Sequence, residues 1–210
     1  MNQNIQIRKI TEIAILVGVA VVLDIVFGFL SKGIFPWGGS ISPAMLPIFI
    51  ISYRYGVKTG MFSGFIFAII QLITTGMFSA SVIAAIPDST IFKYRWLNLL
   101  MVYLLDYILP FTLLGLAGLF KEGLTKVKPF VIGMTIASAV RYLFHGLSGV
   151  LIWASYTEWF NEEFNANVSP FVYSFIVYNL PYMLASLLFC IFSGLIMMKR
   201  GLIAYGLEER

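Results

Sequence analysis

The chain has 210 residues, of which 60% are hydrophobic and only 11% are charged. Soluble domains carry about 25% charged residues, so the composition excludes an ordinary water-soluble fold and predicts a single membrane-embedded domain, residues 1–210. The net charge of +4 is modest and lies in short segments between apolar runs, which argues against a nucleic-acid partner. The one cysteine, Cys190, leaves no partner for a disulfide within the chain and no cysteine metal site.

Six apolar stretches are candidate transmembrane helices, because a spanning helix needs about 20 mainly apolar residues. In chain order they are Ile10–Leu30, Pro43–Tyr53, Val57–Met77, Leu97–Phe120, Phe130–Trp153 and Pro170–Met198. The second is short and is either a tilted span or part of a longer one that begins in the preceding loop. The first stretch lacks a small-residue cleavage pattern and is expected to stay as an anchor. The sequence therefore predicts an all-α integral membrane protein with six transmembrane helices.

The basic residues between these stretches orient the bundle. One side is predicted to hold only Lys32, Lys93 and Arg95. The other side holds the larger group, which is Arg8, Lys9, Arg54, Lys58, Lys121, Lys126, Lys128, Lys199, Arg200 and Arg210. By the positive-inside rule both termini are cytoplasmic. Ser79–Trp96, with a candidate interfacial helix, and the acidic segment Ala154–Ser169 are then outer loops.

Three ionisable residues, Asp106, Arg141 and His145, lie inside the apolar stretches. A charge at bilayer depth is costly and usually faces a bundle interior, where it marks a substrate or ion path. Arg141 and His145 are four residues apart and therefore share one helix face. The predicted topology brings polar and aromatic side chains from separate segments to the outer half of the bundle, namely Trp37, Asp106, Tyr107, His145, Trp153, Tyr173, Ser174, Tyr178 and Asn179.

Each candidate also has a structural interpretation. The tryptophans could belong to interfacial aromatic belts. Asp106 could be a charge partner of Arg141, and Asn179 and Tyr173 could form hydrogen bonds between helices. Asp24, in the first stretch, is interpreted as structural and as facing a neighbouring helix.

The predicted pocket suits a particular class of ligand. A carboxylate attracts a cation or an amino group, and aromatic faces stack on flat rings and hold cations. Asparagine and histidine add directional hydrogen bonds. The ligand that these groups suit best is a flat, nitrogen-rich, cationic heterocycle. A sugar, a lipid or a bare metal ion fits less well.

A series of short motifs then follows the chain in order. They are Thr11-Glu12-Ile13-Ala14, Gly38-Gly39-Ser40-Ile41-Ser42 with Leu46-Pro47-Ile48, Leu105-Asp106-Tyr107, Gly115-Leu116-Ala117-Gly118, Arg141-Tyr142-Leu143-Phe144-His145 with Ser148-Gly149, and Tyr173-Ser174 with Tyr178-Asn179 and Tyr182-Met183. Together they resemble the thiamine-specific substrate-binding (S) component of energy-coupling factor (ECF) vitamin importers. The resemblance implies six helices, an outer pocket and thiamine as ligand, with no cofactor and no metal.

Matched motif by motif, the resemblance implies that the ligand contacts are Trp37, Asp106, Tyr107, His145, Trp153, Tyr173 and Asn179. The sequence departs from the family pattern at several places. Asp106 stands where the family often has Glu, Ser42 where some relatives have an acid, and Phe67 where a Trp is expected. The spacing up to Asn179 is one residue longer, so Tyr173 and Ser174 are alternatives for one role.

The expected partners also come from the resemblance. No Gly-x-x-x-x-Gly-Lys-Ser/Thr sequence is present, so the chain is not expected to hydrolyse ATP. The resemblance implies a transmembrane coupling subunit and two cytoplasmic ATPases, in a bacterial plasma membrane. Ala14 and Gly18 form a small-x-x-x-small pair in the first stretch, and such pairs let helices approach closely in lipid. This pair serves either docking to the coupling subunit or packing inside the bundle.

Other function classes stay open at this point. An intramembrane enzyme could use His145 with Asp106, but the chain has one histidine and neither a His-Glu-x-x-His nor a Gly-x-Ser-x-Gly motif. An autonomous proton-coupled carrier could use Asp106, Arg141 and His145 as a relay, although no internal inverted repeat is visible. An S component for another flat cationic heterocycle, or for a thiamine precursor, is the third alternative.

Overall fold

The computed structural model describes residues 3–31, 33–35, 39–86 and 94–205. Within these ranges, all regular secondary structure is helical. Five helical stretches in this part of the chain are long and apolar enough to cross a membrane, namely Ile5–Leu30, Val57–Thr74, Arg95–Leu119, Val127–Leu151 and Pro170–Lys199. The prediction of an all-α membrane protein is confirmed in this form.

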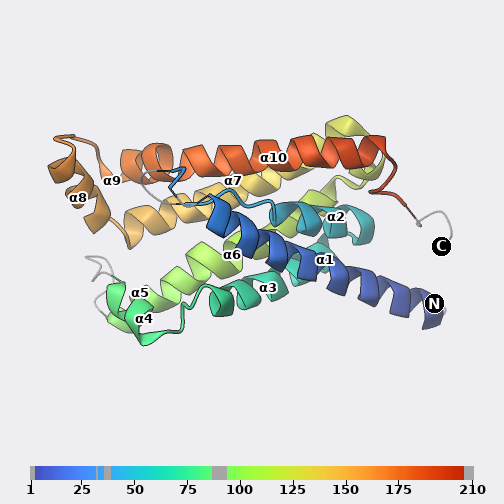
Figure 1. Ribbon diagram of the computed structural model, residues 1–210, viewed down its shortest axis with the longest axis horizontal. Coiled ribbons are helices and arrows are strands. Elements are labelled where there is room, and N and C mark those ends of the chain that lie inside the picture. The colour runs from blue at the N-terminus through green and yellow to red at the C-terminus, as the bar shows by residue number, and fades with distance from the viewer. Residues whose placement is uncertain (1–2, 32, 36–38, 87–93, 206–210) are drawn as a thin grey trace.

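The helices form an elongated bundle (Figure 1). In chain order they are α1 (Gln3–Leu30), α2 (Met45–Tyr55), α3 (Val57–Thr74), α4 (Ala80–Ala85), α5 (Arg95–Val102), the π-helix η1 (Tyr103–Ile108), α6 (Leu109–Thr112), the 3-10 helices η2 (Leu113–Leu119) and η3 (Lys121–Leu124), α7 (Val127–Leu151), α8 (Ser155–Glu163), α9 (Pro170–Val172), the π-helix η4 (Tyr173–Asn179) and α10 (Leu180–Lys199). Two spans are thus composite, because η1 lies between α5 and α6, and η4 lies between α9 and α10.

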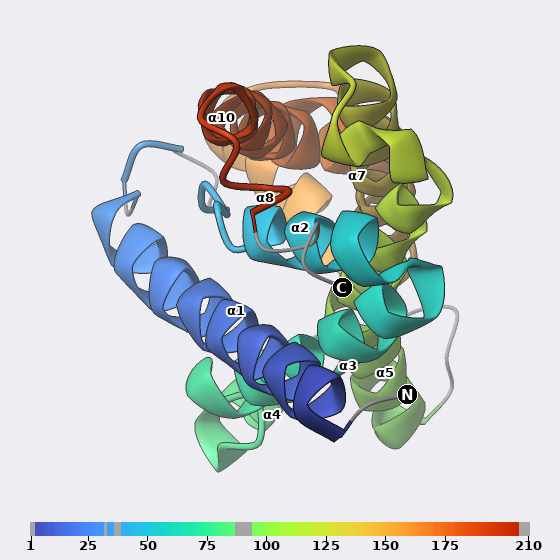
Figure 2. The ribbon, with the colours of Figure 1, turned by 90° about the vertical axis from the view of Figure 1, so that its right-hand side faces the viewer.

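The short helix α2 occupies the centre of the bundle. Its residues from Met45 to Tyr53 are all buried, and it packs against α1, α3 and η2. Figure 2 shows it surrounded by longer helices. Eleven residues rise only about 16 Å, roughly half the hydrocarbon core of a bilayer. The six-helix count therefore stays a prediction, with α2 and the segment before it as the expected sixth crossing.

Glycines bring η2 into close contact with α3 and α2, and they explain one motif of the sequence. A Cβ on Gly115 would lie 2.7 Å from the Gly60 carbonyl carbon, and one on Gly118 would lie 2.6 Å from the Ser52 backbone oxygen. Only a residue without a side chain permits this approach of two backbones. The Gly-Leu-Ala-Gly motif is thus a packing feature, as small residues often are in membrane bundles.

One end of the bundle holds both ends of the described chain (Figure 1). There Arg54 Nε lies 2.5 Å from the Glu12 carboxylate, and Tyr55 donates to the same carboxylate at 2.6 Å. Arg54 also donates to the backbone oxygens of Ile203 and Tyr205, at 2.6 and 2.9 Å. These contacts join α1, α2 and the segment after α10.

The opposite end carries the two segments that were expected to be loops (Figure 1). The first begins with the six-residue helix α4, and residues 87–93 lie outside the described part of the chain. The second was expected to be an aqueous loop but contains the nine-residue helix α8. Its acidic residues Glu158, Glu162 and Glu163 are exposed, as expected for a segment in water.

Candidate substrate-binding site

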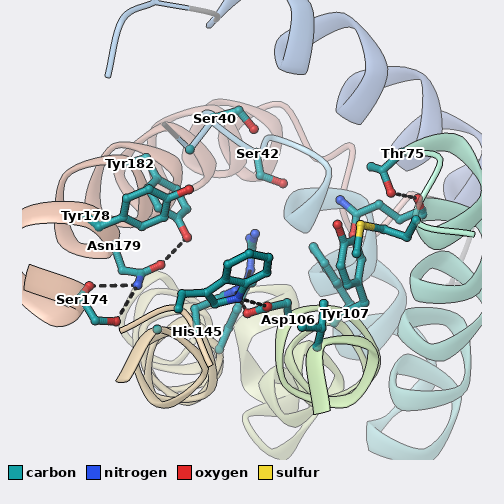
Figure 3. Close-up of a pocket in the computed structure, with 18 of the residues that line it drawn as sticks. Ser40, Ser42, Thr75, Asp106, Tyr107, His145, Ser174, Tyr178, Asn179 and Tyr182 are labelled. Carbon is teal, nitrogen blue, oxygen red and sulfur yellow. Dashed lines mark hydrogen bonds and ion pairs between the residues drawn. The ribbon is translucent and has the colours of Figure 1, made fainter. Parts of the chain in front are cut away.

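A cavity of about 690 Å³ lies between the helices and is lined by the side chains of Figure 3. This volume falls within the range of about 300–1,000 Å³ that small-molecule sites occupy. Its lining comes from α1, α3, α5, η1, α6, α7, η4 and α10, together with the segment before α2. The cavity is therefore shared by nearly all the long helices.

Two π-helical segments present several of the polar groups, and each is followed by a proline. In η1 the Leu109 N–H bonds to the Leu104 carbonyl, five residues back, and in η4 the Leu180 N–H does the same with Phe175. Pro110 and Pro181 come next, and a proline has no N–H to give to the carbonyl four residues earlier. Both freed carbonyls fall inside the π segments, which explains why the helix widens there. Such π segments are frequent at functional sites.

The Asp106 carboxylate is held by three donors at the α7 side of the cavity. Its Oδ2 accepts hydrogen bonds from Ser148 Oγ at 2.8 Å and from Trp153 Nε1 at 3.1 Å. Its Oδ1 lies 3.4 Å from His145 Nδ1. Hydrogen bonds to an ionised group are the stronger kind, so this arrangement fixes a negative charge in the cavity wall.

His145 lies between Asp106 and Arg141. Arg141 Nε donates to His145 Nε2 at 3.3 Å. Because Nε2 accepts this bond, the imidazole is neutral and carries its proton on Nδ1, toward Asp106. The acid and the guanidinium are thus linked through the imidazole, and no direct ion pair between Asp106 and Arg141 is found among the described residues.

The Arg141 side chain is almost fully buried, with 4% of its surface exposed. Its guanidinium carbon lies 4.5 Å from the centre of the Phe111 ring, a cation–π contact. Within the described part of the chain, Nη1 is buried without a hydrogen-bond partner. The arginine therefore balances part of the negative charge of the cavity from a largely buried position in its wall.

A second polar network lies on η4 and the start of α10. The Tyr182 hydroxyl donates to Asn179 Oδ1 at 2.5 Å, and Asn179 Nδ2 donates to the Ser174 backbone oxygen at 2.8 Å. Ser174 Oγ in turn donates to the Gly146 backbone oxygen at 2.9 Å, which joins η4 to α7. Figure 3 shows Asn179, Tyr182 and Ser174 grouped on one side of the cavity.

Gly39, the second glycine of the pair noted in the sequence, meets a specific structural requirement. It has φ of 85°, which side chains rarely tolerate, and it lies against the Tyr182 ring. A Cβ there would approach Tyr182 Cε1 to 2.8 Å. The segment before α2 can therefore cover the η4 side of the cavity only with a glycine at this position.

The structure brings the described candidates together. The cavity lining includes Asp106, Tyr107, His145, Trp153, Tyr173 and Asn179. Tyr173 and Ser174, the two alternatives for one ligand-binding role in the sequence analysis, both line the cavity. Trp37 lies outside the described residues, so its placement stays a prediction.

Sequence reasoning missed part of the lining. Asp24 accepts a hydrogen bond from Gln71 Nε2 at 3.0 Å, so it does face a neighbouring helix, but it also lines the cavity together with Gln71 and Thr75. The signal that singled out Asp106, an acid within an apolar stretch, applies equally to Asp24. The described lining thus has two carboxylates and one guanidinium, a balance that favours a ligand with one positive charge.

Comparison with known proteins decides the family. Residues 10–204 match the sequence model of the family described as thiamine transporter protein (Thia_YuaJ). The chain belongs to this thiamine transporter family. The thiamine transporter ThiT of Bacillus subtilis (strain 168) is 34% identical to it in a 201-residue alignment, with 90% coverage of each chain.

A solved structure supports the fold of this thiamine transporter family member. ThiT from Listeria monocytogenes superposes with a TM-score of 0.64 over 93% of this chain and 95% of that one, at 20% identity. The family membership agrees with the resemblance that the motifs showed. The cavity described above is therefore the candidate thiamine site of this chain.

Proposed function

We propose that this chain is the thiamine-binding subunit of an ECF-type importer, which captures thiamine at the outer face of a bacterial plasma membrane. The observation that carries the proposal is the Asp106 carboxylate, held by Ser148, His145 and Trp153 in the wall of a cavity of ligand size. Thiamine is a monocation with two flat rings, a thiazolium and an aminopyrimidine joined by a methylene bridge, and a hydroxyethyl arm. The proposed site supplies a fixed negative charge for the first ring and aromatic and amide groups for the second.

In the proposed pose the thiazolium lies beside Asp106 and Trp153. The fixed carboxylate attracts the ring's charge, and the indole offers a flat face for stacking. The aminopyrimidine lies beside Asn179 and Tyr182, whose polar atoms are already positioned by their mutual hydrogen bond. His145 and Tyr107 complete the wall, and Tyr173 and the predicted Trp37 close the outer side.

The proposed topology has six crossings with both termini in the cytoplasm and one membrane domain over residues 1–210. The clustering of both described chain ends at one end of the bundle supports an even number of crossings (Figure 1). Arg54, Lys121, Lys126 and Lys128 lie in or beside the short segments between helices, as the positive-inside rule expects of cytoplasmic connections.

Docking to a transmembrane coupling subunit is proposed to use α1, with two cytoplasmic ATPases supplying the energy. Ala14 and Gly18 are exposed, and a Cβ added to Gly18 would meet no atom within 4 Å. Figure 2 shows α1 along the edge of the bundle. A partner helix could therefore approach this face closely, which supports docking over internal packing.

A binding role for His145 and Asp106 is preferred to a catalytic one, because the relatives are named as transporters. The side-chain contacts from Asp106 through His145 to Arg141 are, however, also the arrangement that a proton relay would need. An autonomous proton-coupled carrier is therefore the second candidate.

The purified chain tests both candidates. We expect it to bind one thiamine per chain in detergent without converting it to a product. Reconstituted alone in vesicles with a pH gradient, it should accumulate no thiamine, and uptake should require the coupling subunit, the ATPases and ATP. Uptake driven by the pH gradient alone would favour the proton-coupled carrier, and absence of thiamine binding would contradict both.

A further inference from the structure

The two carboxylates of the cavity differ in how many donors hold them. Asp106 is surrounded by Ser148, Trp153 and His145, at 2.8, 3.1 and 3.4 Å. Asp24, on α1, receives one hydrogen bond from the described residues, through its Oδ2 from Gln71 Nε2. The other oxygen of Asp24 therefore has lone pairs available to a ligand.

The partner of Asp24 is also incompletely satisfied. Gln71 Oε1 is buried and has no hydrogen-bond partner among the described residues. A buried acceptor without a donor costs free energy, because it has lost its water and gained nothing in return. Since both side chains line the cavity, a hydroxyl on a ligand could donate its one hydrogen to the second oxygen of Asp24 or to Gln71 Oε1.

We propose that Asp24 and Gln71 form a second subsite, which accepts a hydrogen-bond donor of the ligand and excludes anionic groups. This inference rests on the proposed function, with thiamine as the ligand. In that frame the donor is the hydroxyl of the hydroxyethyl arm. Asp106 supplies the charge for the ring cation, and Asp24 determines specificity at the far end of the molecule.

The order of groups in thiamine supports this assignment. The thiazolium is the middle unit, with the pyrimidine attached on one side and the hydroxyethyl arm on the other. Figure 3 shows Asp106 between two groups of side chains, with Asn179 and Tyr182 on one side and Tyr107 and Thr75 on the other. Thr75 lies one turn after Gln71 on the same helix end and donates to its backbone oxygen at 2.7 Å. With the pyrimidine beside Asn179, the arm points toward Gln71 and Asp24.

This placement predicts a preference for the free alcohol over its phosphate ester. A phosphate monoester carries about −1.5 to −2 charges at pH 7 and offers acceptor oxygens in place of the hydroxyl donor. Beside Asp24 it would add like-charge repulsion and leave the carboxylate without its donor. Wild-type protein should therefore bind thiamine roughly tenfold or more tightly than thiamine monophosphate, the scale of a lost hydrogen bond to a charged group.

The test compares thiamine and thiamine monophosphate on the purified wild type and on Asp24→Asn, with dissociation constants from tryptophan fluorescence. Asparagine keeps the shape, removes the charge and supplies an N–H for phosphate oxygens. We expect the preference for thiamine to narrow roughly tenfold, through weaker thiamine and stronger monophosphate binding. Glu162→Gln is the matched control, because it removes an exposed acid of α8 outside the cavity and should leave the preference unchanged.

A second measurement needs no substitution, so it holds even where Asp24→Asn does not fold. Wild-type protein should bind a thiamine analogue with hydrogen in place of the hydroxyl roughly tenfold more weakly than thiamine. Equal binding of the two would overturn the subsite, as would an Asp24→Asn variant with the wild-type preference. A third outcome compares thiamine with an analogue that lacks the pyrimidine amino group. If wild-type protein prefers thiamine and Asp24→Asn binds the two equally, Asp24 contacts the amino group, and the assignment to the hydroxyl is overturned. Failure of wild-type protein to bind thiamine at all would contradict the proposed function itself.

Discussion

At the scale of single residues, Asp106 stands out because three donors surround its carboxylate. Its three donors all come from α7 and the residue pair that follows it, so its position depends on one neighbouring span. Such an arrangement lowers the cost of placing a carboxylate inside an apolar bundle, because each donor replaces part of the lost water. Because these donors already occupy its lone pairs, Asp106 acts on a ligand mainly through electrostatic attraction.

The first prediction is that Asp106→Asn weakens thiamine binding roughly thirtyfold or more. Loss of one partner of a buried charge pair costs about 2–5 kcal/mol, which corresponds to that factor. Titration of the purified variant with thiamine measures it, and a melting curve checks the fold. A variant that melts early but binds thiamine normally would show that Asp106 is structural.

The second prediction is that Trp153 reports ligand binding. Its indole nitrogen donates to Asp106 at 3.1 Å, so a cation held by that carboxylate must lie against or beside the ring. Thiamine should quench tryptophan fluorescence in wild-type protein, and Trp153→Phe should reduce the quench. Trp159→Phe is the control, because Trp159 lies on α8 away from the cavity lining. An unchanged quench in both Trp153→Phe and Trp37→Phe would remove the proposed stacking role.

At the scale of elements, the two π segments supply several polar groups of the cavity wall. Asp106 and Tyr107 lie in η1, and Tyr173, Ser174 and Asn179 lie in η4. Each π segment inserts a residue into the helix and so turns the side chains before it relative to those after it. Pro110 and Pro181 stabilise these segments by removing the N–H that an uninterrupted α-helix would use.

The third prediction is that Pro110→Ala separates stability from binding. Alanine restores the missing N–H, so η1 can return to α-helical hydrogen bonding and Asp106 turns by about 100°, the angle of one residue. Thermal stability should be equal or higher, while thiamine affinity should fall roughly tenfold or more, because the charge leaves its position. Pro129→Ala is the control, since Pro129 lies in the first turn of α7, where its N–H would be unsatisfied anyway. Unchanged affinity in Pro110→Ala would show that the π segment is not needed for binding.

At the scale of the whole molecule, the cavity and the proposed docking face are separated in space. The cavity lies between the helices, whereas α1 presents exposed apolar side chains such as Ile15, Val22 and Phe29 along its length. In lipid such a face needs no partner, but its small residues allow one to approach. Glu12 of α1 pairs with Arg54 of α2 at the end of the bundle that holds both ends of the described chain, so the helix that carries the proposed docking face is tied to the central helix.

The fourth prediction concerns this separation. Ala14→Trp and Gly18→Trp should leave thiamine affinity in detergent unchanged and abolish thiamine uptake in cells that supply the partner subunits. The physical reason is that a large side chain prevents close helix contact but does not reach the cavity. Ile25→Trp, a large replacement for an exposed apolar residue of the same helix, is the control and should affect uptake less. Lost binding would place this face inside the bundle, and normal uptake would place docking elsewhere.

Several features were determined by the sequence itself. Apolar length and charge depletion require helices in lipid, since every backbone polar group must be satisfied within its own segment there. The cost of a charge at that depth singled out Asp106, Arg141 and His145, and their helical spacing placed Arg141 and His145 on one face. These arguments depend on local chemistry, so they needed no knowledge of how the helices pack.

Other features were decided only by the tertiary structure. The number of donors around each carboxylate depends on distant segments of the chain. Asp106 receives hydrogen bonds from Ser148 and Trp153, whereas Asp24 receives one from Gln71. The same holds for the imidazole of His145 between an acid and a guanidinium, and for α2, whose apolar sequence fits a membrane span but which is a buried half-length helix. The hydrophobicity of a segment determines that it is removed from water, but contacts between segments determine whether its side chains face lipid, protein or ligand.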